Sequence, residues 1–193
     1  MKKLLLLFLL FSFFSYSQED FSHIDKQETK YLMAYFDAEK HKVLEEYDKS
    51  LMLYEKCISI NPLESSAYNE IAKIYFFLQD WDNAEYYIEE AISLEHNNKW
   101  YYYLLLDIYL VQENLESQVD VYTKLIELEE NNFTYYIQKL DLYRRLKLYK
   151  KALKFINKST KFFGSSAPLL KAEIEIYLAQ DNYNLAERTA KQL

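Results

Sequence analysis

The sequence predicts an all-α protein, an α-solenoid in which about five helix hairpins stack with a period of 34 residues. Three observations predict this class. The chain of 193 residues contains one glycine and two prolines, too few turn formers for a many-stranded β fold. Large and small residues recur every 34 positions, which is typical of repeat proteins. Within each interval, apolar residues follow the spacing of an α-helix.

The 34-residue period holds in four registers without an insertion. Two registers are tyrosines, a third is aromatic or apolar, and the fourth consists mainly of small residues. The four sets are Tyr68, Tyr102 and Tyr136; Tyr75, Tyr109, Tyr143 and Tyr177; Tyr47, Trp81, Leu115, Tyr149 and Tyr183; and Ser50, Ala84, Gln118, Ala152 and Ala186. Four registers that share one period predict structurally equivalent units.

Each repeat is predicted to be a helix hairpin. Apolar residues lie at i, i+3, i+4 and i+7 from Tyr68 and at i, i+4, i+7 and i+8 from Ala84, and each set forms one helix face. The segment "LQDWDNA" between them is a short polar turn, and either Asp80 or Asp82 could cap the second helix. The run "WYYYLLLDIYL" at 100–110 has strand-forming residues, but its place in the period predicts the first helix of the third hairpin.

With repeat starts near 31, 65, 99, 133 and 167, the sequence resembles the tetratricopeptide repeat family over residues 31–193. The tyrosines of the first two registers fall on the family's aromatic positions 4 and 11, and Ala84, Ala152 and Ala186 fall on its small position 20. The last repeat is incomplete. The resemblance implies a protein-binding scaffold that takes a protein or peptide in a concave groove lined by the first helix of each hairpin.

The resemblance also implies which side chains face that groove, namely repeat positions 2, 5, 9 and 12. The candidate partner-binding residues are Tyr35, Asn69, Lys73, Trp100, Tyr103, Asp107, Ile137, Asp141 and Arg144. Trp100 and Tyr103 are the strongest candidates, because Trp and Tyr are enriched among the residues that dominate binding energy. The alternative for both residues is contact with the neighbouring hairpin.

The sequence predicts no enzyme, no cofactor and no metal site. The three histidines lie in different segments without metal-ligand spacing, and a single glycine cannot form a phosphate-binding loop. Paired acids such as Glu89 and Glu90 are expected on solvated faces. Cys57 is the only cysteine, so no intramolecular disulfide can form, and we expect it to be a small buried residue.

The N-terminus has the pattern of a secretory signal peptide, residues 1–17. "MKK" precedes a largely apolar run of thirteen residues, Leu4 to Tyr16, which as a helix spans about 20 Å and falls short of a bilayer core of about 30 Å. Ser15 and Ser17 suit cleavage after Ser17. We therefore expect an exported protein, periplasmic or extracellular, with no stable membrane span after cleavage. Residues 18–30 would form a polar linker or a helix extension.

Charge is unevenly distributed. Residues 113–130 hold six acids and one lysine, whereas residues 139–161 hold nine basic residues with Asp141 as the only acid. A basic helix could contact anionic lipid or nucleic acid, but a solvated convex face is the favoured interpretation. The formal net charge of −7 and the export signal argue against a nucleic-acid partner.

Two functional hypotheses follow. The first is a free-standing exported scaffold or adaptor, and the alternative is the sensory or docking region of a larger cell-envelope signalling or secretion system.

The final helix, predicted over 182–193, should pack Leu185, Ala186, Ala190 and Leu193 onto the fifth hairpin. Because no further helix follows there, this end is expected to fray or to join a partner, including a second copy of the chain.

Overall fold

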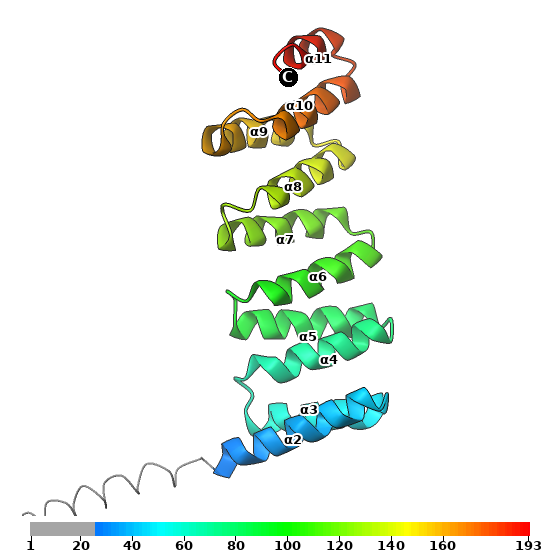
Figure 1. Ribbon diagram of the computed structural model, residues 1–193. Helices are drawn as coiled ribbons and strands as arrows, with labels where there is room; N and C mark the ends of the chain where they lie inside the picture. Colours follow the sequence, from blue (N-terminus) through cyan, green and yellow to red (C-terminus); the bar gives the residue numbers. More distant parts are fainter. Residues whose placement is uncertain (1–25) are drawn as a thin grey trace, which may run out of the picture. The chain divides into compact units, whose positions relative to one another are not determined.

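The computed structural model describes residues 26–193, which form ten α-helices and no strand (Figure 1). The predicted signal peptide lies outside the described residues. The chain divides into two compact units, the first ending at Ile74 and the second running from Tyr75 to Leu193. The helices form successive hairpins with a 34-residue period, so the predicted fold class is confirmed.

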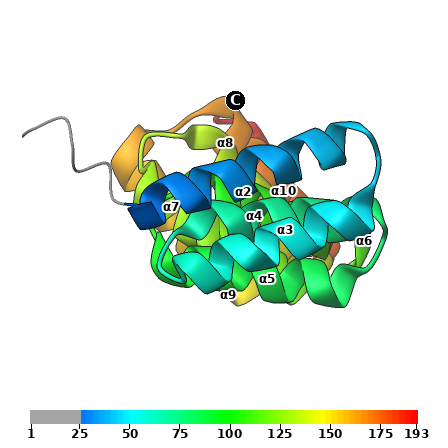
Figure 2. The same cartoon turned by 90° about the horizontal axis from the view of Figure 1, so that it is seen from below.

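The first unit is a hairpin of α2 (Lys26–Val43) and α3 (Tyr47–Ile60), followed by most of α4 (Ser65–Phe77). The two hairpin helices lie side by side in Figure 2. Ala34 and Ala38 of α2 and Tyr54 and Cys57 of α3 are all buried between them. Burial raises the pKa of the Cys57 thiol to about 11, so this cysteine is an unreactive core residue, as the sequence predicted.

The second unit contains the remaining helices, and each of them packs on the next along the chain. They are α5 (Trp81–Leu94), α6 (Lys99–Val111), α7 (Leu115–Leu128), α8 (Phe133–Arg145), α9 (Tyr149–Phe163), α10 (Ala167–Ala179) and α11 (Tyr183–Ala190). Across both units, the second helix of each hairpin begins 34 residues after the one before it. The run at 100–110 lies in α6, so helical periodicity prevails there over local strand propensity.

All five hairpins close with the same turn. The backbone N–H of the residue before the second helix donates to a carbonyl five residues earlier, for example Asn114 to Tyr109 at 3.0 Å and Leu148 to Tyr143 at 2.8 Å. This is the 6→1 bond of a Schellman motif. It requires one left-handed residue, and φ there lies between 54° and 63° at Glu45, Gln79, Glu113, Lys147 and Asp181. Glycine is the usual residue at such a position, yet this chain uses none there.

The second helix of each hairpin has a buried residue at the small-residue position, and all five are 4% exposed or less. Three are alanines, and the two polar ones satisfy their side chains within the hairpin. Ser50 Oγ donates to the Ala38 carbonyl at 2.9 Å, and Gln118 Nε2 donates to the Tyr109 carbonyl at 2.9 Å. A polar residue is therefore accepted at this closely packed position because a first-helix carbonyl is within reach.

The C-terminal helix differs in part from the prediction. α11 ends at Ala190, and Ala186 and Thr189 are its buried residues, whereas Ala190 and Leu193 are exposed. The predicted burial of Ala190 and Leu193 is therefore wrong, because Ala190 is the last residue of α11 and Leu193 lies beyond the helix. Leu178 of α10 and Tyr183 of α11 are 47% and 64% exposed, so this end keeps apolar surface in contact with solvent.

The left-handed turns yield a stability prediction. Glu113→Gly should stabilise the protein by about 0.5–1 kcal/mol. A non-glycine residue in the left-handed conformation costs about 1–2 kcal/mol, and glycine removes that cost. Part of the stabilisation is lost again, because glycine loses more backbone entropy on folding. Glu113→Ala is the matched control, because it removes the same exposed carboxylate and keeps the strain. Urea unfolding followed by circular dichroism measures both variants. Equal stability of the two would contradict the explanation.

Candidate functional site

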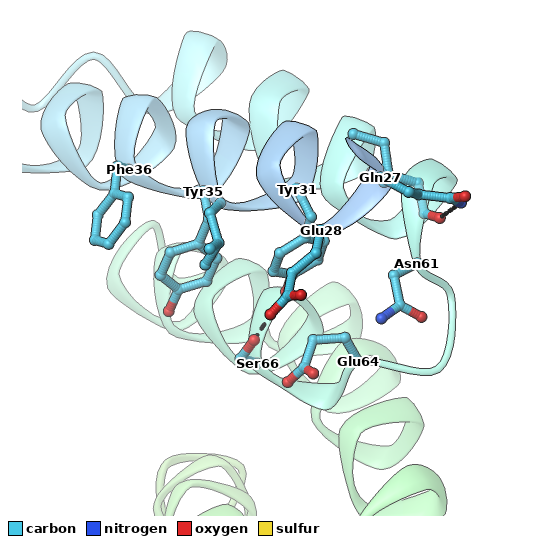
Figure 3. Close-up of a pocket in the computed structure, with 10 residues that line it drawn as sticks. Gln27, Glu28, Tyr31, Tyr35, Phe36, Asn61, Glu64 and Ser66 are labelled. Atoms are coloured by element: carbon cyan, nitrogen blue, oxygen red, sulfur yellow. Dashed lines mark hydrogen bonds between the residues drawn. The ribbon is translucent and has the colours of Figure 1, made fainter. Parts of the chain in front are cut away.

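The first unit holds a groove of about 690 Å³ between α2, the α3–α4 loop and the start of α4 (Figure 3). Tyr31, Tyr35 and Phe36 of α2 line it, and Glu64 and Ser66 line the opposite side. Tyr31 is positioned by a 2.9 Å hydrogen bond between its hydroxyl and Ser66 Oγ. Burial raises the pKa of Tyr31 to about 12, so its phenol stays neutral at physiological pH. Phe36 remains 67% exposed.

A charged cluster joins three of the predicted site residues. Glu70 of α4 is 8% exposed and accepts hydrogen bonds from Lys42 Nζ at 2.5 Å, from Lys73 Nζ at 2.6 Å and from Asn69 Nδ2 at 3.0 Å. Burial is the main cause that raises the pKa of the Tyr35 phenol, and the negative charge of nearby Glu70 is the second. Tyr35, Asn69 and Lys73 thus surround one buried carboxylate.

Glu70 was missed by the sequence analysis because its repeat position is not a groove position. Burial by itself raises the pKa of this carboxyl, but the hydrogen bonds from Lys42 and Lys73 outweigh it and hold the pKa below its usual value. Lys42 also donates to Glu39 Oε1 at 2.7 Å. The lysines of this cluster are therefore paired within the protein.

In the second unit, Trp100 and Tyr103 lie on the first turns of α6. Trp100 is 68% exposed, although its neighbours Tyr101 and Tyr102 are almost fully buried. Its ring packs edge-on against Tyr103 at 5.5 Å between centroids, and Lys99 Nζ lies 5.5 Å from the indole. The indole is thus held at the surface by its neighbours rather than packed into the core.

Tyr103 is half-buried and combines the two roles that the sequence left open. Its hydroxyl hydrogen-bonds to the hydroxyl of Tyr135 in α8, and Tyr135 in turn donates to Glu129 Oε2 at 2.7 Å. Glu129 also accepts from Lys99 Nζ at 2.5 Å. This chain of hydrogen bonds fixes the ring on which Trp100 rests.

Asp107, one α-helical turn further along α6, is exposed. Partial burial raises the pKa of its carboxyl. Burial also raises the pKa of Tyr122 in α7, and the charges of Asp107 and Tyr103 add to that shift. Asp107 lies four residues after Tyr103, so both side chains lie on one face of α6.

The last three candidates meet in a groove of about 370 Å³ between α8 and α10. Ile137, Asp141 and Arg144 line one side, and Lys171 and Glu175 line the other. The Arg144 guanidinium donates to Asp141 through Nη2, and its Nε lies 3.5 Å from Glu175 Oε2. The hydrogen bond with Asp141 raises the pKa of Arg144, so its charge is already balanced before any ligand arrives. Glu175 was not predicted, because pairing across two helices is invisible in the sequence.

These surfaces combine exposed aromatic rings with charges that are paired within the protein. Among residues 26–193, no group of three or more histidine, cysteine, aspartate or glutamate side chains could hold a metal ion. The helices that the structure describes include none with the length and apolarity of a membrane span. Exposed aromatic rings beside internally paired charges are the features that interfaces favour.

Successive antiparallel hairpins with an exposed aromatic and polar surface on their first helices define a helical-repeat protein. Residues 65–98, 101–132 and 133–162 match the family model described as tetratricopeptide repeat, so the chain carries tetratricopeptide repeats, as predicted. A search of curated proteins found no match to the chain.

Solved structures share the fold. A MamA protein is 14% identical, with a TM-score of 0.58, and the match covers 84% of this chain and 88% of that one. YrrB, described as a TPR protein with an unusual peptide-binding site, is 17% identical with a TM-score of 0.56, and covers 81% and 80%. The first TPR of Spaghetti (RPAP3), bound to the HSP90 peptide SRMEEVD, is 23% identical with a TM-score of 0.51, and covers 62% and 97%.

The cluster around Glu70 predicts an acid-sensitive stability. Glu70→Gln should destabilise the protein by about 1–2 kcal/mol at pH 7, less than the 3–5 kcal/mol of a fully buried pair because Lys73 is half exposed. Because the folded-state pKa is lowered, the stabilisation by Glu70 is present above the unfolded pKa near 4.5 and is lost as pH falls through the folded value.

The measurement is chemical unfolding of wild type and variant between pH 3 and pH 7. The difference between the two should shrink below about pH 4.5. Glu55→Gln, an exposed carboxylate on α3, is the control and should change stability by less than about 0.5 kcal/mol. A difference that stays constant with pH would refute the assignment of Glu70.

Proposed function

We propose that the protein is an exported scaffold or adaptor that binds a protein or peptide segment along the groove side of its first helices. The observation that carries this proposal is Trp100. An indole that is 68% exposed contributes little to the core, yet Tyr103, Lys99 and Glu129 hold it in place. An ordered, exposed tryptophan is the residue type most enriched where binding energy concentrates.

The groove charges restrict the kind of ligand. Lys73 and Arg144 already contact Glu70 and Asp141, so a ligand carboxylate would have to compete with an internal partner. Apolar or aromatic ligand side chains meet no such competition at Trp100 or in the groove beside Phe36 and Tyr35. The ligand that fits best is therefore a segment anchored by apolar side chains, with polar groups that satisfy the mixed charges around them.

The fold neighbours support a peptide ligand by analogy. YrrB and the first TPR of RPAP3 are both described with a peptide or a peptide-binding site. Export rests on residues 1–17 alone, whose charged start, short apolar run and small residues before Gln18 match a cleaved signal. The proposed compartment is the periplasm or the extracellular space.

The binding role of Trp100 is testable with one substitution. Trp100→Ala should weaken the affinity for peptides selected on the wild-type protein by phage display by at least roughly 2 kcal/mol. Thermal stability should change by less than about 0.5 kcal/mol, since the residue is exposed. Tyr86→Ala is the matched control: this ring is 56% exposed and packs edge-on against Tyr87 on a second helix, away from the groove positions. Equal losses in both variants would refute the assignment.

The processing proposal has its own test. Mass spectrometry of the protein recovered from its native cells should find a mature chain that begins at Gln18, with a formal charge of 21 − 30 = −9. A protein that retains Met1 in the membrane fraction would overturn the signal-peptide interpretation.

A further inference from the structure

Helix α9 presents a lysine-rich surface on the side opposite to its core residues. Ala152, Ile156 and Ser159 are its buried residues. Its lysines are all exposed, and none of them forms an ion pair within residues 26–193; they are Lys150, Lys151, Lys154, Lys158 and Lys161. The segment 142–172 contains nine lysines and arginines and no acid, in a chain of net charge −7. This contrasts with Lys42, Lys73 and Arg144, which pair with carboxylates of the chain.

The lysines border a cleft of about 490 Å³, which is within the range of ligand sites. Its lining combines two aromatic rings, Tyr143 of α8 and Phe155 of α9, with four lysines at positions 151, 154, 158 and 161. The two rings meet edge-on, with centroids 6.0 Å apart and planes at 83°. The cleft therefore offers an apolar contact surface surrounded by positive charge.

A buried lysine lies behind the rings. Lys139 is 6% exposed, and its Nζ is 5.2 Å from the Phe155 ring and 5.7 Å from the Tyr143 ring. Its one hydrogen bond is to Thr123 Oγ1 at 2.5 Å, and no carboxylate in the described chain pairs with it.

The charge of Lys139 is poorly compensated. Burial lowers the pKa of Lys139; the charges of Asp120 and Glu127 act to raise it, and Lys158 acts to lower it further. A negative group bound in the cleft would offset the desolvation cost of the charged Lys139 side chain and its repulsion from Lys158.

We propose that this cleft is a second binding site, separate from the groove, for an extended acidic protein segment that carries an aromatic side chain. The aromatic side chain packs on Tyr143 and Phe155, and the carboxylates pair with the four lysines that line the cleft, at positions 151, 154, 158 and 161.

The dimensions suit an extended segment. From Lys151 to Lys161 the row rises about 15 Å at 1.5 Å per residue. An extended chain spans that length with about five residues, three of them with side chains on one side roughly 6.6 Å apart. The four lysines are about 4.5–6 Å apart along the helix axis, a spacing that their long side chains can adjust. Carboxylates on one side of such a segment can therefore meet successive lysines.

A broad polyanion fits less well. α8 packs on both α7 and α9, and α7 carries exposed Glu116, Asp120 and Glu127. A membrane surface or a nucleic-acid duplex wide enough to cover α9 would also meet these acids and the negative charge of the whole chain. A single extended strand can follow the lysine row without touching them.

The experiment uses a fluorescein-labelled peptide of sequence DEFEDEFE and fluorescence anisotropy at low salt. Lys154→Glu with Lys158→Glu should weaken binding at least roughly tenfold. The matched control, Lys147→Glu with Lys150→Glu, makes the same charge change outside the cleft and should weaken binding less than about threefold, since it alters only the long-range field. Replacing both phenylalanines of the peptide by alanine should also reduce affinity. Circular dichroism and thermal melting establish that each variant is folded.

Three results would overturn the proposal. The first is an equal loss of affinity in the two double variants, which would indicate a non-specific effect of net charge. The second is unchanged affinity for the alanine peptide. The third is binding to anionic phosphatidylglycerol vesicles, sensitive to Lys154→Glu with Lys158→Glu, without binding to the peptide. Trp100→Ala should leave the affinity for DEFEDEFE unchanged, so failure of this site and failure of the proposed groove function are distinguishable.

Discussion

Every hairpin of this protein depends on one reversed turn, in which a left-handed residue lets a backbone N–H reach the carbonyl five positions earlier. The turn brings the second helix back along the first, so that small or internally satisfied residues such as Ser50, Ala84 and Gln118 can be buried at the close approach. If the turn opened, two amphipathic helices would have no partner, and neither could bury its apolar face alone. That the chain maintains five such turns without glycine shows how strongly packing favours them.

Charge is organised differently around Lys73 and Arg144 than on helix α9. Lys73 on α4 and Arg144 on α8 meet carboxylates of the chain, so their charges contribute to the stability of the fold. Within residues 26–193 the lysines of α9 form no ion pair, and Lys139 of α8 is buried near them. A binding surface whose charges are already paired selects a ligand by shape and apolar contact. A surface of unpaired lysines selects a ligand by charge.

Much of the fold could be predicted from periodicity. Helix type, hairpin connectivity and the place of the second helices follow from the 34-residue period, because equivalent positions must meet equivalent neighbours. The prediction was wrong at the C-terminus, where Ala190 and Leu193 are exposed. Ala190 is the last residue of α11 and Leu193 lies beyond it, so the apolar pattern there does not indicate burial. The candidate site residues followed from repeat position, but their binding role stays a prediction.

The sequence by itself determined the class of fold, the helix faces and the exposed position of residues such as Asp107, since these depend on spacing along one helix. Only the tertiary structure decided which charged side chains are paired with one another. Glu70 pairs with Lys42, Glu175 approaches Arg144, and Lys139 is left without an acid. The physical reason is that Coulomb energies depend on distance and burial between helices, and residues about 30 positions apart in sequence give no local sign of that contact.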